Sequence, residues 1–224
     1  MCRMAAFSTK EVVDISSLFE IVSWMAKNGK KAEHSDGYGV LVFDEISKFE
    51  YKTTVPIYDD FRGRELVKQI HGKLGLIHAR KASQGVPVGL QQLHPFHIRG
   101  RYLAHNGTIT GADRSNAFQS DTYGFFSNVV DFEDFESLVN NVKRYISTHD
   151  FTGVNFLLVD EFEKALYVGC IYKKDVDYFT LHYKIDALGF YVYSEQMEDS
   201  LLEMENGEIL KVVEGNIVEQ GKVF

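Results

Sequence analysis

Cysteine and proline are scarce in this chain of 224 residues, which contains two cysteines and three prolines. Cys2 and Cys170 lie far apart in the sequence, so they do not form the closely spaced framework of a disulfide-rich secreted domain. This usage is typical of a reducing compartment, and we expect a cytoplasmic protein. Linkers rich in Pro, Gly or Ser and internal repeats are also missing. The sequence therefore predicts a single domain over residues 1–224.

Long apolar runs and basic runs are missing as well. No apolar stretch approaches the ~20 residues of a membrane helix, and the chain start does not have the basic and apolar regions of a signal peptide. With 24 Lys+Arg against 32 Asp+Glu the formal net charge is −8, which argues against general nucleic-acid binding. We expect neither a membrane nor a nucleic-acid partner.

The most informative residue that is present is the cysteine at position 2. Removal of Met1 would leave one residue that carries both a thiol and a free α-amine. Reference pKa values are ~7.7–8.0 for such an amine and ~8.5 for a thiol, so near neutral pH a free amine can accept a thiol's proton. Nucleophiles of the Thr/N-terminal-amine type work in this way. The alternative is that Cys2 is an ordinary residue near an ordinary start.

Periodicity predicts helices and strands in a mixed fold. Apolar residues at helical spacing predict helices over 14–29 and 135–150, and a shorter helix is expected over Arg64 to His71. Short apolar runs predict strands, which are Met4 to Phe7, Tyr38 to Phe43, Phe49 to Thr54, Leu74 to His78, Tyr102 to His105, Asn155 to Asp160, Ala165 to Ile171, Tyr178 to Tyr183, Phe190 to Ser194, Ile209 to Val213 and Asn216 to Val218. Tight-turn dipeptides around the last strands favour antiparallel pairing. We expect two packed antiparallel sheets with helices outside.

Four polar segments stand where strands begin or end: Cys2-Arg3-Met4, residues 78–85 (HARKASQG), His94-Pro95-Phe96 with His105-Asn106-Gly107, and Ser120-Asp121-Thr122. Together with Ser35-Asp36-Gly37-Tyr38-Gly39, they resemble the class II glutamine amidotransferases, which are N-terminal-nucleophile hydrolases. The small stand-alone members are the most similar. The resemblance implies an α+β fold, a four-layer α/β/β/α sandwich of two antiparallel sheets.

The resemblance also implies roles for individual residues in cleaving the side-chain amide of glutamine. Cys2 would attack the amide through a thioester, and Asn106 and Gly107 would form the oxyanion hole, although Asn-Gly is also a strong hairpin signal. Arg80 would hold the α-carboxylate with help from Ser83, whereas an unrelated arginine and serine would form a surface salt bridge and a loop cap. Asp121 would receive the α-ammonium, and it could also be a helix N-cap ahead of residues 123–130.

The remaining histidines and cysteine receive simpler interpretations. His94 is interpreted as a wall of the substrate pocket, and His78 and His105 as structural or orienting residues. No His-x-x-x-His or Cys-x-x-Cys spacing is present, so we expect no metal, and the implied mechanism needs no cofactor. Cys170 is interpreted as a small buried hydrophobic residue.

The sequence departs from the family pattern at two positions and leaves the function open between three hypotheses. Tyr123 stands where many relatives carry an acid, and Gln84 where many carry a histidine. No synthase domain is recognised, so an amidotransferase would supply ammonia to a separate synthase. The alternatives are a stand-alone hydrolase of γ-glutamyl amides or peptides and a catalytically silent binding module on the same fold.

Overall fold

The computed structural model describes residues 2–83 and 85–224 of the chain. Its strands form two antiparallel sheets that stack face to face. The seven-stranded sheet has the order β11 (Leu202–Glu203), β9 (His182–Ile185), β10 (Gly189–Tyr193), β1 (Arg3–Asp14), β4 (His71–Ala79), β2 (Tyr38–Phe43) and β3 (Lys48–Thr53). The six-stranded sheet has the order β13 (Asn216–Lys222), β12 (Glu208–Val213), β8 (Ala165–Cys170), β7 (Asp150–Asp160), β6 (Arg101–Thr110) and β5 (Phe96–Ile98).

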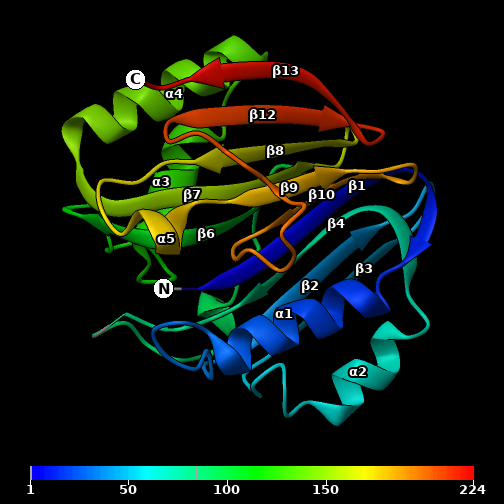
Figure 1. Ribbon diagram of the computed structural model, residues 1–224. Coiled ribbons are helices and arrows are strands. Elements are labelled where there is room, and N and C mark those ends of the chain that lie inside the picture. Colours follow the sequence, from blue (N-terminus) through cyan, green and yellow to red (C-terminus); the bar gives the residue numbers. More distant parts are fainter. Residues whose placement is uncertain (1, 84) are drawn as a thin grey trace.

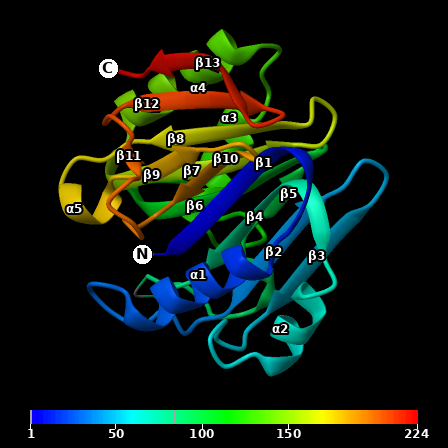
Figure 2. The same ribbon diagram turned by 45° about the vertical axis from the view of Figure 1, so that its right-hand side comes forward.

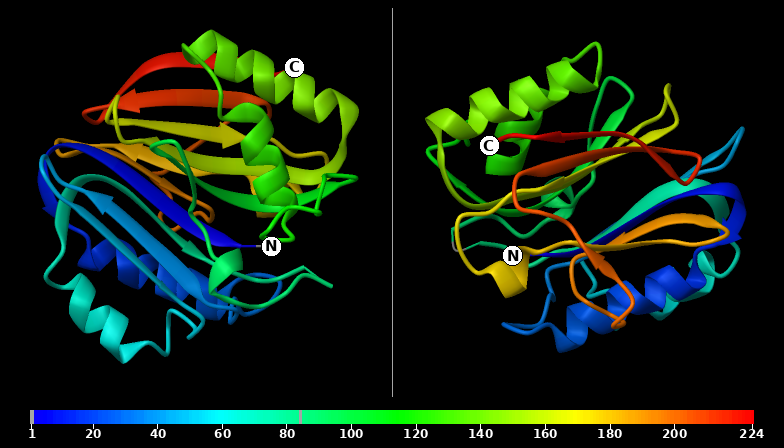
Figure 3. Two further views of the ribbon diagram at one scale, coloured as in Figure 1. Left: turned by 180° about the vertical axis from the view of Figure 1, so that it is seen from behind. Right: turned by 45° about the horizontal axis from the view of Figure 1, so that its top comes forward.

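Helices cover the two outer faces of this pair of sheets. Figure 1 shows α1 (Ser16–Asn28) and α2 (Phe61–Val67) beneath the seven-stranded sheet, and α3 (Asp121–Val129) and α4 (Phe135–Thr148) on the other side of the molecule. The view from behind in Figure 3 shows α3 and α4 lying across the six-stranded sheet. Two short elements complete the described chain, α5 (Val176–Phe179) and the 3₁₀ turn η1 (Leu90–Gln92). The expected four-layer α/β/β/α sandwich is confirmed.

Successive residues of a strand point to opposite faces, and in this fold both faces are packed against other layers. On β1, Met4 and Ala6 point into the core between the sheets, whereas Ala5 and Phe7 point outward toward α1. Leu138 and Val142 of α4 pack in the same way against the outer face of the six-stranded sheet. Because both faces are covered there, central strands such as β2 are continuous apolar runs rather than alternating ones, whereas the edge strands β3 and β13 are partly exposed.

Two sequence predictions were wrong in position or type. The helix expected over Arg64 to His71 begins earlier, because Asp60 caps it by accepting a hydrogen bond from the Gly63 N–H (3.0 Å), and His71 already belongs to β4. The strand expected over Tyr178 to Tyr183 is divided between α5 and β9. Tyr178 and Phe179 favour strands by composition, but here one helical turn buries both rings in the core between the sheets.

Pairing in the seven-stranded sheet brings the start of the chain beside the end of β4. Arg3 is opposite Ala79. Cys2, which precedes Arg3, and Arg80, which follows Ala79, therefore lie at the same end of the sheet. The guanidinium of the buried Arg3 pairs with Glu195 and lies over the ring of Tyr178, at 4.4 Å from the ring centre. Figures 1 and 2 show the N-terminal end of β1, a strand of the seven-stranded sheet, near β6 of the other sheet. The chain start is thus fixed at the junction of the layers.

Candidate active site

Cys2 is held by contacts to both sheets. Its main-chain nitrogen donates a hydrogen bond to Oδ1 of Asn106 on β6 (2.6 Å), and its Sγ lies 3.9 Å from the carbonyl oxygen of Lys81, just beyond β4. The side chain is largely buried, with 7% of its surface exposed. The thiol therefore has one fixed position at the seam between the sheets. Met1 lies outside the described residues.

The amide of Asn106 is divided between two tasks. Its oxygen accepts the hydrogen bond from Cys2, while its Nδ2 is buried and has no hydrogen-bond partner among the described residues. A buried amide donor without a partner costs free energy of ~1–3 kcal/mol, which a ligand oxygen would recover. Asn106 therefore offers a preorganised donor beside the thiol.

Gly107 follows Asn106 inside strand β6, so this Asn-Gly pair is not a hairpin turn. Its φ is +149°, and a Cβ atom there would come within 1.7 Å of the carbonyl oxygen of Gly153 on β7. Only glycine fits both the dihedral angle and the close approach. This places the main chain of Gly107 in the wall of a pocket that also contains Cys2.

Six of the seven predicted site residues line that pocket. Its lining contains Cys2, Arg80, Lys81, Ala82, Ser83, Val86, Gln92, His94, His105, Gly107, Ser120, Asp121 and Thr122. Asn106 is not part of the lining but bonds directly to Cys2. The pocket has a volume of about 30 Å³, which is room for about two water molecules.

Arg80 is buried, not part of a surface salt bridge. It is 5% exposed, its Nη2 donates to the carbonyl oxygen of Pro87 (3.1 Å), and its Nη1 has no partner among the described residues. Its main chain is fixed by Gly37, whose carbonyl oxygen accepts from the Arg80 N–H (2.8 Å). A buried guanidinium with an unused donor is suited to a carboxylate ligand.

Asp36 holds the loop that follows Arg80, a role that the sequence interpretation did not assign. Its main-chain N–H donates to the Arg80 carbonyl oxygen (3.1 Å), and its Oδ2 accepts from the Ala82 N–H (2.7 Å). The Asp-Gly-aromatic-Gly element of the sequence was the available signal. The sequence alone gave this element no physical role, because the contact of Asp36 with the loop depends on the pairing of β2 with β4.

Asp121 lies at the N-terminus of α3 but is not its cap. The Ser120 hydroxyl caps the helix by accepting from the Tyr123 N–H (3.4 Å). The carboxylate of Asp121 accepts from the N–H groups of Ile109 (2.9 Å) and Thr122 (3.0 Å). Nη2 of Arg114 also lies 3.7 Å from Oδ2 of Asp121. The carboxylate thus faces the pocket with a cation already nearby.

Ser83 and Tyr123 mark two further sides of the pocket region. The hydroxyl of Ser83 lies 3.4 Å from that of Thr108, and Gln84 is outside the described residues. Tyr123 packs against Phe118 and Phe96, with ring centres 4.4 and 5.6 Å apart. The aromatic cluster explains what Tyr123 does in place of an acid, and it leaves Asp121 as the carboxylate of the pocket lining.

Three histidines form a buried cluster behind Cys2. Burial lowers the pKa of His78 to about 3 and that of His105 to about 4, and it holds the pKa of His94 well below its ordinary value. All three are therefore neutral at pH 7. In the described part of the chain, no group of three His, Cys, Asp or Glu side chains is arranged to hold a metal ion.

The other cysteine and the larger cavity of the described chain lie away from this pocket. A larger cavity of about 270 Å³ lies toward the other end of β1, near Ser8, Lys73 and Glu214, without a thiol in its lining. Cys170 is fully buried as predicted, and burial raises the pKa of its thiol to about 12. None of the described helices is both long enough and apolar enough to cross a membrane.

Comparisons with known proteins agree with this geometry. The model of the family described as glutamine amidotransferases class-II matches residues 1–129. No curated protein sequence matches the chain significantly. Among solved structures, an allosteric regulatory enzyme of purine biosynthesis is similar, with a TM-score of 0.74 at 20% identity. The glutamine phosphoribosylpyrophosphate amidotransferase of B. subtilis has a TM-score of 0.71 at 20% identity.

The extent of these matches differs between the solved structures. All of this chain aligns with the two enzymes, but it covers only 49% of each of them. A glutamine aminotransferase class-II domain protein from Silicibacter pomeroyi is covered over 100% of both chains, with a TM-score of 0.67 at 17% identity. At these identities the structural likeness establishes the fold.

Proposed function

This chain belongs to the class II glutamine amidotransferases, and from that premise we propose that it hydrolyses the side-chain amide of glutamine through a thioester on Cys2. The observation that carries the proposal is the side-chain amide of Asn106, of which only the oxygen is hydrogen-bonded. One end binds the nitrogen of Cys2, and the other is an unused buried donor. A nucleophile and an oxyanion donor are thereby linked through a single side chain.

In the proposed reaction, Met1 has been removed and the α-amine of Cys2 takes the proton of its own thiol. The sulfur attacks the γ-carbonyl carbon, and the negative charge that develops on oxygen is stabilised by Asn106 Nδ2 and the Gly107 N–H. The C–N bond then breaks, the proton passes to the leaving nitrogen, and ammonia departs. Water cleaves the γ-glutamyl thioester to glutamate and regenerates the thiol.

The same pocket offers partners for the other groups of glutamine. Arg80, assisted by Ser83, would bind the α-carboxylate, and Asp121 would bind the α-ammonium. His94 would form part of the wall. No step in this sequence calls for a metal or another cofactor. Arginine is the suitable cation for the carboxylate because its planar fork binds both oxygens.

A second part of the proposal concerns the ammonia that leaves. We propose that residues 1–224 act as one amidotransferase domain and that a separate synthase accepts the ammonia. A thiol nucleophile needs a reducing compartment, which supports a cytoplasmic location.

Intact-mass analysis before and after exposure to an electrophilic glutamine analogue tests the proposal. We expect a protein that lacks Met1 and gains one adduct on Cys2. The Cys170→Ala variant is the matched control and should label like the wild type, whereas Cys2→Ala should neither label nor release glutamate. Glutamate release by Cys2→Ala, or an adduct on Cys170, would rule out the mechanism.

The same samples separate the competing functions. Steady glutamate release from free glutamine supports the amidotransferase. Turnover only with a larger γ-glutamyl amide or peptide would point to the stand-alone hydrolase. Retained Met1 together with no turnover of either substrate would point to the silent binding module.

A further inference from the structure

The residue before the oxyanion donor lies where the sheet is incomplete. Strand β5 pairs with β6 only as far as Phe96 opposite Leu103, so no strand of the described chain continues beside His105 on that edge. The opposite edge of β6 remains paired, with His105 opposite Phe156 on β7. A buried main chain at such a point needs other hydrogen-bond partners.

Two imidazoles provide those partners. The N–H of His105 donates to Nδ1 of His94 (3.4 Å), and the carbonyl oxygen of His105 accepts from Nε2 of His78 (3.2 Å). The rings of His78 and His94 are also in contact, with His78 Nε2 2.9 Å from His94 Nδ1. Two side chains therefore do what a neighbouring strand would do for this residue.

The donors and acceptors fix the proton on each ring. Because a carbonyl oxygen can only accept, Nε2 of His78 carries its proton, and this one N–H is shared between the His105 carbonyl oxygen (3.2 Å) and Nδ1 of His94 (2.9 Å). Because the His105 N–H can only donate, Nδ1 of His94 is unprotonated, and the proton of this neutral ring is on Nε2. Burial keeps both rings neutral, which preserves this arrangement at pH 7.

The side chain of His105 is held as firmly as its main chain. Its Nδ1 lies 2.8 Å from the hydroxyl of Thr122 on α3, and its Nε2 lies 3.3 Å from the carbonyl oxygen of Gly153. His105 is thus tied to β7, to α3 and to the two imidazoles. The next residue along the strand is Asn106.

We propose that His78 and His94 are positioning residues that replace the missing strand and set the oxyanion hole. By holding both main-chain groups of His105, they fix where the Asn106 amide and the Gly107 N–H point. This inference rests on the proposed function, because it assigns a purpose to the geometry of that site. A displacement of about 1 Å in such a site can cost about 10²-fold in rate.

His78 gives the cleaner test, because it is absent from the lining of the pocket whereas His94 is part of it. His78→Met removes the donor to the His105 carbonyl oxygen at similar side-chain length, and His78→Gln restores an N–H donor. We expect His78→Met to lower kcat for glutamine by about 10²-fold with little change in KM, and His78→Gln to recover most of the loss. Wild-type kcat in His78→Met would overturn the proposal.

Two further measurements separate positioning from a general structural defect. Alkylation of Cys2 by iodoacetamide forms no oxyanion, so its rate should be the same in His78→Met and wild type. In an Asn106→Ala background, His78→Met should cause a much smaller loss of kcat than in the wild type, because one of the two donors that it positions is gone and only the Gly107 N–H remains. A full additional loss, or a parallel loss of alkylation, would contradict the inference.

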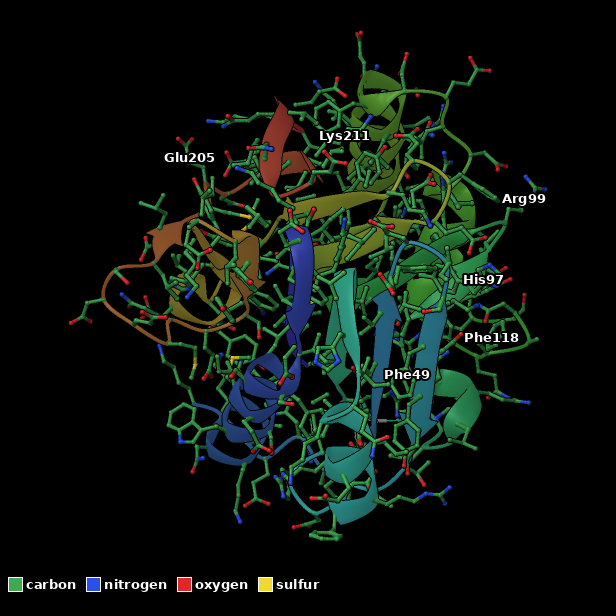
Figure 4. All side chains as sticks on the ribbon, turned by 90° about the vertical axis from the view of Figure 1, so that its right-hand side faces the viewer. Phe49, His97, Arg99, Phe118, Glu205 and Lys211 are labelled. Carbon is green, nitrogen blue, oxygen red and sulfur yellow. The ribbon has the colours of Figure 1, made fainter. Side chains whose placement is uncertain are left out.

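His97→Met provides a matched control. His97 is exposed on β5, the edge strand of the six-stranded sheet, and is labelled in Figure 4. Its ring stacks on Tyr102, with ring centres 4.3 Å apart. We expect wild-type kcat. A loss equal to that of His78→Met would show a nonspecific effect.

If His78→Met does not fold, the same contrast can be made at His94. His94→Asn keeps an acceptor for the His105 N–H, and His94→Leu removes it. We expect a higher kcat in the former, and equal kcat would overturn the proposal. Failure of the proposed function itself has a different signature, because the wild type would then release no glutamate or Cys2→Ala would retain activity.

Discussion

Arg80 is a buried cation that the described residues satisfy only in part. Its Nη2 bonds to a carbonyl oxygen, whereas its Nη1 is buried without a partner. Keeping a charge in this state is costly, because buried charges are stable only when they are paired and hydrogen-bonded. A carboxylate ligand would supply both.

We predict that Arg80→Met raises KM for glutamine without a comparable loss of stability. Hydrogen bonds to charged groups contribute ~1.5–3 kcal/mol, so KM should rise roughly 10- to 150-fold. Removing a poorly paired buried charge should leave the free energy of unfolding nearly unchanged or higher. Steady-state kinetics and urea unfolding measure the two quantities. An unchanged KM would contradict the assignment of Arg80.

Arg114 competes for the carboxylate that is proposed to bind the substrate ammonium. Its Nη2 lies 3.7 Å from Oδ2 of Asp121, and its side chain is 40% exposed. Exposed ion pairs are worth only ~0.2–1 kcal/mol. Arg114 is therefore expected to weaken substrate binding, but only slightly.

We predict that Arg114→Gln lowers KM for glutamine by up to about 5-fold, which corresponds to an exposed ion pair. Arg99→Gln is the control, because Arg99, labelled in Figure 4, forms an ion pair with Asp131 (2.7 Å) that is more exposed and does not involve a residue of the pocket. It should leave KM unchanged. A higher KM in Arg114→Gln would show that Arg114 assists binding instead.

At the proposed oxyanion hole, β6 leaves no room between Gly107 and β7 for a side chain. A Cβ on Gly107 would lie 1.7 Å from the Gly153 carbonyl oxygen, which belongs to main chain and cannot rotate away. The φ of +149° is a second obstacle to any other residue. The close approach fixes the Gly107 N–H beside the pocket.

We predict that Gly107→Ala lowers kcat by about 10²- to 10³-fold, the usual effect of losing one oxyanion donor. Gly111→Ala, just beyond the same strand, is the control. Its φ is also positive (+78°), but a Cβ there would meet nothing within 4 Å. It should affect stability by strain alone and leave kcat unchanged. Similar activity in the two variants would show that the close approach is unimportant.

The elements explain which parts of the site could be predicted from sequence. Strand β2 has its predicted bounds, Tyr38–Phe43, because both faces are buried and the apolar run is continuous. The edge strand β5 was not predicted, since three residues give no period that can be recognised. Asn106-Gly107 could be placed in a site rather than a turn only by its resemblance to a family. Local sequence alone favoured a hairpin.

The partners of the predicted residues could not be obtained from the sequence. His78 and His94 are 16 positions apart, and their meeting with His105 depends on how the two sheets stack. Similarly, Asp36 reaches Ala82 only because β2 pairs with β4. Such contacts are set by register and packing. Residue types indicate the chemistry of a site, and the fold determines which side chains come into contact there.

The whole molecule links site and stability, because the proposed catalytic groups come from both sheets. Cys2 precedes a strand of one sheet and Asn106 belongs to the other, and the apolar core between the sheets holds them in place. His78, His94 and His105 are neutral because they are buried in the same structure. His34 is a fourth buried histidine, and burial lowers its pKa to about 3.

We predict that stability falls steeply as the pH decreases from 7 to 5. His34, His78, His94 and His105 have folded-state pKa values below that of an unfolded histidine, ~6.5. Their contribution is complete above that value and is lost as the pH falls toward the folded-state values, because only the unfolded chain then binds protons. Each histidine should add a slope of about 1.4 kcal/mol per pH unit below that value.

Urea unfolding at a series of pH values measures this slope. The interval from pH 7 to 8 is an internal control, because these histidines are neutral there in both states and contribute no slope. His34→Gln should reduce the slope between pH 6 and 5 by about 1.4 kcal/mol per pH unit, the share of one histidine. His34 contacts Ala26 and Tyr178, not the pocket, so this variant should retain kcat. Equal stability at pH 7 and pH 5 would mean that the buried imidazoles are protonated in the fold, and the tautomers assigned to His78 and His94 would then be wrong.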